Sequence, residues 1–85
     1  MQKKSFSTQA IYLQVKFRRV RKIGLAEIQS FIGAMESCGP FVVGILICNT
    51  GFTKAAEEYL RYINKKIFLI HSKSPGSYTL YHSLR

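Results

Sequence analysis

Gln14 and Lys16 are the residues whose types and spacing best suit chemistry at a phosphate group. They stand two positions apart in Gln14-Val15-Lys16, so a strand would place both side chains on one face, with their Cα atoms roughly 6.6 Å apart. A lysine there can stabilise charge that develops on a phosphate or orient an attacking water. A glutamine oxygen can take the place of a carboxylate near Mg²⁺, although it is neutral and binds more weakly. A solvated strand face would show the same three-residue pattern.

A run of cations follows directly. It comprises Lys16, Arg18, Arg19, Arg21 and Lys22, and no acidic residue lies within it. Such a run predicts a nucleic-acid surface whose affinity falls steeply with salt. A solvated basic loop or a nuclear-import signal is the alternative interpretation.

A second candidate is the loop Thr50–Lys54, which leads from an apolar run into a helix. Free N–H groups at a helix start, the Thr53 hydroxyl and Lys54 could together hold a phosphate. The glycine-rich pattern of a P-loop is absent. Helix capping by Thr53, with Phe52 packed in the core, explains the same residues without a ligand.

The cysteines and histidines predict neither a metal site nor a nucleophile. Cys38 and Cys48 have no Cys-x-x-Cys spacing and no neighbouring His, and we expect both to be small buried hydrophobic residues. His71 and His82 have no partners at zinc-ligand spacing.

Composition supports a polyanionic partner. The 85 residues carry 13 Lys and Arg against 4 acids, a formal charge of +9. The acids are all glutamates, at positions 27, 36, 57 and 58, so a site that needs several carboxylates must be assembled from these. The longest apolar run, 41–48, is too short to span a membrane as a helix. With no apolar stretch typical of a secretory signal near the start, we expect an intracellular protein of the cytoplasm or nucleus. The acid-free first 26 residues leave organellar import as an alternative.

Hydrophobic periodicity predicts strand, helix, strand, helix, strand. The predicted segments are a strand at 9–18, a helix at 25–38, a strand at 41–48, a helix capped by Thr53 that runs to about Asn64, and a strand at 67–70. We expect an α/β fold with a mainly parallel three-stranded sheet and two helices. Residues 1–8 would be a flexible N-terminus, 9–72 the domain, and 73–85 a polar tail that is either an edge strand or disordered.

The first strand differs from the other two. Tyr12, Gln14, Lys16 and Arg18 share a polar face opposite an apolar one, which predicts an edge or a site on the polar side. The strands at 41–48 and 67–70 are apolar on both faces, as in sheets covered on both sides.

Taken in order, these segments resemble the C-terminal part of an Mrr-type restriction endonuclease domain, a branch of the PD-(D/E)xK nuclease superfamily. The resemblance covers about Ile11 to His71. It rests on the Gln-x-Lys strand and on the stretches Phe31–Met35, Gly44–Ala56 (with one residue of slack) and Ile67–Ser72.

The resemblance implies Mg²⁺-dependent hydrolysis of DNA phosphodiester bonds, with Gln14 and Lys16 as the catalytic residues. The family carries a metal-binding Asp on a strand before Gln-x-Lys, whereas no acid precedes Gln14 here, and His71-Ser72 replaces Asp-Gly. We therefore expect a partial restriction-endonuclease-like core that is catalytically incomplete. It would bind DNA through Arg18, Arg19, Arg21, Lys22, Thr53 and Lys54.

An exposed first strand would also favour a homo-oligomer, or a second chain that supplies the missing strands. Two other functions remain open. One is a non-enzymatic protein-interaction module that pairs through its open sheet edge. The other is a basic α/β module that binds RNA or a nucleotide through the Thr50–Lys54 loop.

Overall fold

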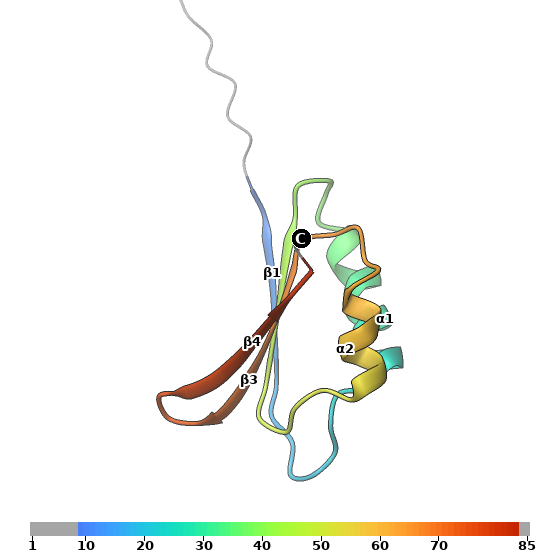
Figure 1. The fold of residues 1–85 in the computed structure, drawn as a ribbon. Coiled ribbons are helices and arrows are strands. Elements are labelled where there is room, and N and C mark those ends of the chain that lie inside the picture. The colour runs from blue at the N-terminus through green and yellow to red at the C-terminus, as the bar shows by residue number, and fades with distance from the viewer. Residues whose placement is uncertain (1–8, 84–85) are drawn as a thin grey trace, which may run out of the picture.

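Six elements alternate along the chain in the computed structural model, which describes residues 9–83. They are β1 (Ile11–Lys16), α1 (Leu25–Glu36), β2 (Val43–Cys48), α2 (Lys54–Leu60), β3 (Ile67–Ser74) and β4 (Ser77–His82). The strands form one sheet in the order β1-β2-β3-β4 (Figure 1). The first three run parallel and β4 runs antiparallel to β3. The α/β class and the two parallel crossovers are confirmed.

Both helices pack on the same face of the sheet (Figure 1). Each one lies in a crossover between neighbouring parallel strands, and the chain moves in the same direction across the sheet both times. Crossovers of one handedness then deliver their helices to one side. Within residues 9–83 the sheet is therefore covered on one face only, which corrects the expectation of two covered faces.

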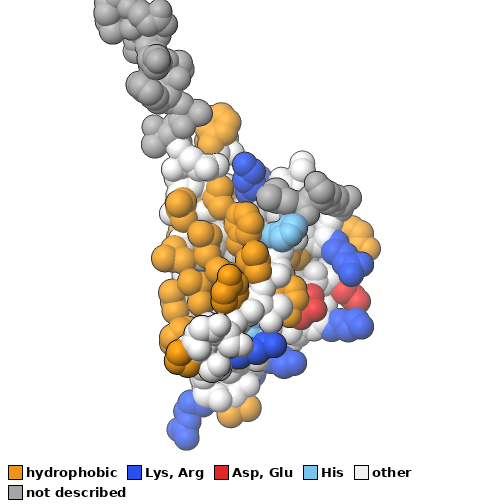
Figure 2. Space-filling model, turned by 60° about the vertical axis from the view of Figure 1, so that its left-hand side comes forward, with side chains coloured by type: hydrophobic (Ala, Val, Ile, Leu, Met, Phe, Trp, Pro, Cys, Tyr) orange, Lys and Arg blue, Asp and Glu red, His pale blue; other side chains and the backbone are white. Residues whose placement is uncertain are grey.

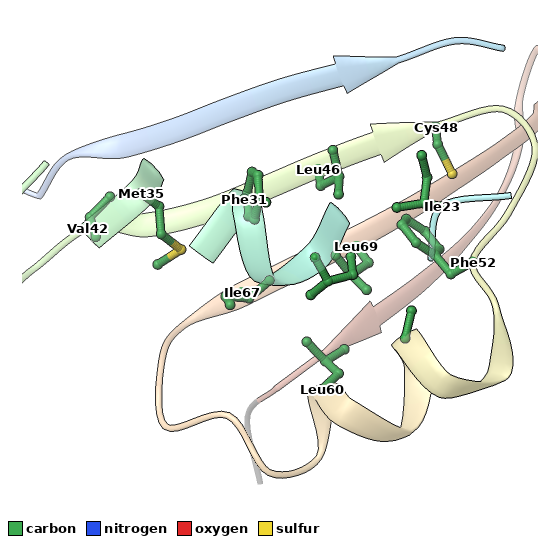
Figure 3. Close-up of a cluster of buried hydrophobic side chains, with 12 residues drawn as sticks. Ile23, Phe31, Met35, Val42, Leu46, Cys48, Phe52, Leu60, Ile67 and Leu69 are labelled. Atoms are coloured by element: carbon green, nitrogen blue, oxygen red, sulfur yellow. The ribbon is translucent and has the colours of Figure 1, made fainter. Parts of the chain in front are cut away.

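The core lies between the helices and this face (Figure 3). Phe31 and Met35 of α1 pack against β2, where Gly44 leaves room for them. A Cβ at Gly44 would lie 2.6 Å from Met35 Sδ and 2.9 Å from a Phe31 ring carbon. Glycine therefore sets how closely α1 approaches the sheet.

The sheet is one strand wider than predicted. Within the expected polar tail, Ser77–His82 forms β4 along a β3 that extends to Ser74. Gly76 has a φ of +80° in the turn between them, a conformation that glycine adopts without strain. Ser83 closes the end of the strand, since its Oγ accepts from Ile67 N at 3.0 Å and donates to Lys65 O.

Several boundaries and one burial assignment also differ from expectation. The helix capped by Thr53 ends at Leu60 rather than near Asn64, and the first helix ends at Glu36. Cys48 is buried as expected, but Cys38 is exposed, because it follows the end of α1. The flexible N-terminus expected at residues 1–8 lies outside the described residues.

The apolar face of β1 points to solvent and its polar face points to the helices, which is the reverse of the usual arrangement. Ile11, Leu13 and Val15 are each more than half exposed, on the uncovered face of the sheet. Tyr12, between them, points to the helices, where its ring centroid lies 5.3 Å from that of Phe31. The polar stripe of β1 is therefore partly covered, whereas its apolar stripe lies on the surface shown in Figure 2.

Candidate functional site

Gln14 and Lys16 lie on one face of β1, as the period of two predicts. They stand opposite Leu46 and Cys48 of β2, whose side chains are buried on the helix side. Because β1 is an edge strand, this position is covered by α1 only in part. The Lys16 side chain keeps 29% of its surface exposed, which leaves it within reach of a ligand.

Glu27, near the start of α1, joins the basic run to the helix. Its carboxylate accepts from Arg18 Nη1 at 2.8 Å and from Nη2, and it lies 3.6 Å from Lys16 Nζ. It also accepts from Gly24 N at 3.3 Å, which caps the helix. A negative charge is favourable at this end of a helix. The sequence shows no acid within the basic run, and the fold supplies one from the next element.

Two loops are hydrogen-bonded into a frame at the carboxyl ends of β1 and β2. The Asn49 side chain makes two bonds with the backbone of Arg18, each 2.7 Å long. Thr50 Oγ1 donates to Arg21 O at 2.8 Å, and Ile23 N donates to Gly51 O at 2.9 Å. Sequence reasoning missed Asn49, whose position directly after a strand is the only available signal.

This frame fixes the backbone of the basic connector, defined as residues 18–22, while three of its side chains stay in solvent. Arg19, Arg21 and Lys22 are exposed, and within residues 9–83 none of them has an ion-pair partner. Their charges are therefore available to an anion, whereas those of Lys16 and Arg18 are partly neutralised by Glu27.

Thr53 lies beside Ile23 and Gly24, which directly follow this connector. Thr53 N donates to Ile23 O at 2.9 Å, and Thr53 Cγ2 lies 4.0 Å from the position of a Cβ on Gly24. The Thr53 hydroxyl accepts from Ala56 N at 3.2 Å, so it caps α2, as predicted. Lys54 is exposed at the first position of that helix.

The donor set does not fit a Mg²⁺ site. Mg²⁺ requires close to six oxygen ligands, usually anchored by one or two carboxylates. Glu27 is the carboxylate next to Lys16, and it already accepts from Arg18. Glu36 stands nine positions later on α1, about 13 Å along the helix. Across residues 9–83 there is no cluster of three His, Cys, Asp or Glu side chains that could hold a metal.

Cys48 and His71, which lie near the frame, do not provide a nucleophile. Burial raises the pKa of the Cys48 thiol, which keeps it protonated, and its Sγ lies 3.5 Å from Gly51 O. The ring of His71 packs against Gly51, and its Nε2 lies 3.3 Å from Asn49 O. Both residues therefore support the loop.

Comparisons with known proteins give one match. A family model for the Mrr catalytic domain, described as a restriction endonuclease, matches residues 1–74. No curated protein and no solved structure matches the chain. In the described part of the chain, no helix is long and apolar enough to cross a membrane.

Proposed function

The chain belongs to the Mrr-type restriction endonuclease family, and we propose that it binds DNA through the basic connector without cleaving it alone. The observation that carries this proposal is the frame that holds Arg19, Arg21 and Lys22 in solvent at the carboxyl ends of parallel strands. Open α/β sheets bind their ligands at that end. Lys54, exposed next to Thr53 at the start of α2, would extend the surface for the same anion.

Phosphate contacts explain both the charge and its placement. A protein that neutralises phosphates with lysine and arginine releases counterions, so its affinity falls as salt rises. The slope of log affinity against log salt concentration is about −0.9 for each phosphate neutralised. Sequence is recognised by side chains that contact base edges inside a groove of the DNA. The connector instead presents long, solvated Arg and Lys side chains, which suit contacts with phosphates. We therefore expect binding that differs little between DNA sequences.

Cleavage requires more than this chain offers. Nucleases of this superfamily generally use Mg²⁺, and the donor atoms beside Lys16 do not fit that ion. Lys16 lies 3.6 Å from Glu27, which neutralises part of its charge. Lys16 and Gln14 would still face a bound phosphate from the edge of the sheet. We propose that they contact the DNA backbone and that hydrolysis needs carboxylates which residues 9–83 do not supply.

The test measures binding to a short duplex by fluorescence anisotropy across a salt series. The Arg19→Ala, Arg21→Ala variant should lower the slope by about 2, with a similar loss for every sequence tested. Its matched control is Lys65→Ala, Lys66→Ala, which removes the same charge at the opposite end of the sheet. Equal loss in both variants would show general charge attraction, and an unchanged slope in the connector variant would reject this surface.

Cleavage is tested separately with Mg²⁺ and supercoiled DNA. We expect no nicking by the purified chain. Nicking that disappears in Lys16→Ala would overturn the statement that the chain is incomplete and leave the binding surface intact.

An interaction with a second chain is the other function with direct support. β1 is an edge of the sheet, so one side of its backbone has no neighbouring strand among the described residues. We propose this edge as the place where a partner adds a strand. We also propose an intracellular location for the protein, because DNA is found there. A partner strand would slow hydrogen exchange of the outward β1 amides, and unchanged exchange upon binding would exclude pairing there.

A further inference from the structure

The uncovered face of the sheet presents a continuous apolar surface. Every second residue of a strand points to this face, and the register places three such residues from each strand on it. We call these twelve residues the open face. They are Ile11, Leu13 and Val15 on β1, Val43, Ile45 and Ile47 on β2, Phe68, Ile70 and Ser72 on β3, and Tyr78, Leu80 and His82 on β4.

No lysine, arginine or glutamate belongs to the open face, although the chain carries a charge of +9. Ile11 and Tyr78, at its two edges, are each 65% exposed, and Leu80 is 47% exposed. Figure 2 shows hydrophobic side chains gathered over the sheet, with Lys and Arg at its margins. A contiguous apolar patch of this size on a soluble protein marks an interaction surface.

The dimensions suit a protein interface. Four strands spaced about 4.8 Å apart, each with at least six residues at about 3.3 Å, give roughly 19 by 20 Å, or about 380 Å² in projection. Side chains that stand on the pleats have a larger accessible area than this projection. Two such faces in contact give about 760 Å² in projection, and the relief of the side chains raises the buried area from there toward the roughly 1,200 Å² at which specific interfaces begin.

The geometry points to a second copy of this chain as the occupant, with the two open faces packed into a sandwich. Two sheets of equal twist pack face to face about 10 Å apart, with their strands about 30° from parallel. A two-fold interface uses the same patch on both chains, so an uncharged patch meets an uncharged patch. A partner with a charged or strongly polar surface would find no groups here to pair with beyond Ser72, His82 and the Tyr78 hydroxyl.

Charge also selects the direction of packing. The basic connector follows the carboxyl end of β1, at one end of the sheet. A two-fold axis across the strands puts the two connectors at opposite ends, about 20 Å or more apart, beyond the screening length of about 8 Å at physiological salt. The dimer would then present two separated basic surfaces. The face differs from the β1 edge and from the connector, so this inference does not depend on DNA binding.

Sedimentation velocity of the full chain over a concentration series tests the inference. We expect a species of twice 9.7 kDa that dissociates on dilution. Leu13→Lys and Leu80→Lys should each weaken dimerisation by about 100-fold or more, because each buries an unpaired charge. The matched control is Val20→Lys, which makes a similar change at an 85% exposed connector residue outside the open face. It should leave the dimer intact.

The two variants also separate this dimer from pairing along the edge. Leu80 lies on β4, three strands from β1, so a dimer formed through the β1 edge would survive Leu80→Lys. Survival of the dimer in that variant, or a wild-type monomer at every concentration, would overturn the inference. Both leucines are about half exposed in the single chain, so an unchanged far-UV circular dichroism spectrum should confirm folding.

Discussion

Glu27→Gln tests how the fold controls the charge of the candidate site. The substitution removes the negative charge that Lys16 and Arg18 share but keeps an oxygen that can accept from Gly24 N. Two cations near the connector then lose their internal partner. If DNA takes up both, the log–log salt slope should steepen by about 1–2, and affinity at low salt should rise.

The same substitution should lower the free energy of unfolding. A hydrogen bond to a charged group contributes roughly 1.5–3 kcal/mol when buried, whereas an exposed pair contributes about 0.2–1 kcal/mol. Glu27 and Arg18 keep about a quarter of their side-chain surface exposed, so a value between these limits applies. We expect a loss of about 1–2 kcal/mol, which lowers the melting temperature by about 4–8 °C per kcal/mol.

The assay combines thermal unfolding with the anisotropy salt series. Glu36→Gln is the control, because Glu36 lies on the same helix and pairs with Lys65 at 2.9 Å, far from the connector. It should change neither the salt slope nor the affinity beyond the effect of one unit of net charge. A folded Glu27→Gln protein with the wild-type slope would refute the argument that Glu27 holds cations back from DNA.

Three further predictions concern the core and the cysteines. Gly44→Ala should destabilise the fold by about 1–3 kcal/mol in thermal unfolding, because its Cβ would clash with Met35 and Phe31. Gly33→Ala, on the open side of α1, should stabilise it by about 0.5–1 kcal/mol, and the opposite order of melting temperatures would contradict this packing. Iodoacetamide at pH 8 should label exposed Cys38 first, whereas Cys48 should react only after unfolding. Because burial raises the pKa of Cys48 in the folded state, unfolding free energy should fall as pH rises above about 8.5, and Cys48→Ala should abolish that component.

The elements and their order were predictable because hydrophobic periodicity reports local structure directly. The period of two put Gln14 and Lys16 on one side, and Thr53 marked the start of α2. The tail was ambiguous, since Ser74-Pro75-Gly76-Ser77 fits both a hairpin turn and a flexible linker. Pairing with β3 decides between them, and that is a tertiary contact.

The contacts that build the site were not predictable from spacing alone. Glu27 lies nine residues after Arg18, and Asn49 lies 31 residues after it. Nothing local links these residues, because the crossover through α1 and the return through β2 bring them together. The site residues predicted from the sequence lie together near the carboxyl ends of β1 and β2. Glu27 and Asn49, which orient Arg18, were identified only from the structure.

The exposed apolar face and the partly covered polar stripe have one physical cause. Alternation in β1 shows that two faces differ but not which one the helices cover. Crossovers of the same hand place α1 on the side of Tyr12, where the ring packs on Phe31 and where Glu27 meets Lys16. Among the described residues, the opposite side of β1 then lies uncovered, beside the apolar residues of β2 and β3 on the same face. The arrangement that creates the candidate site therefore also creates the open face, so a change that moves α1 should alter DNA binding and self-association together.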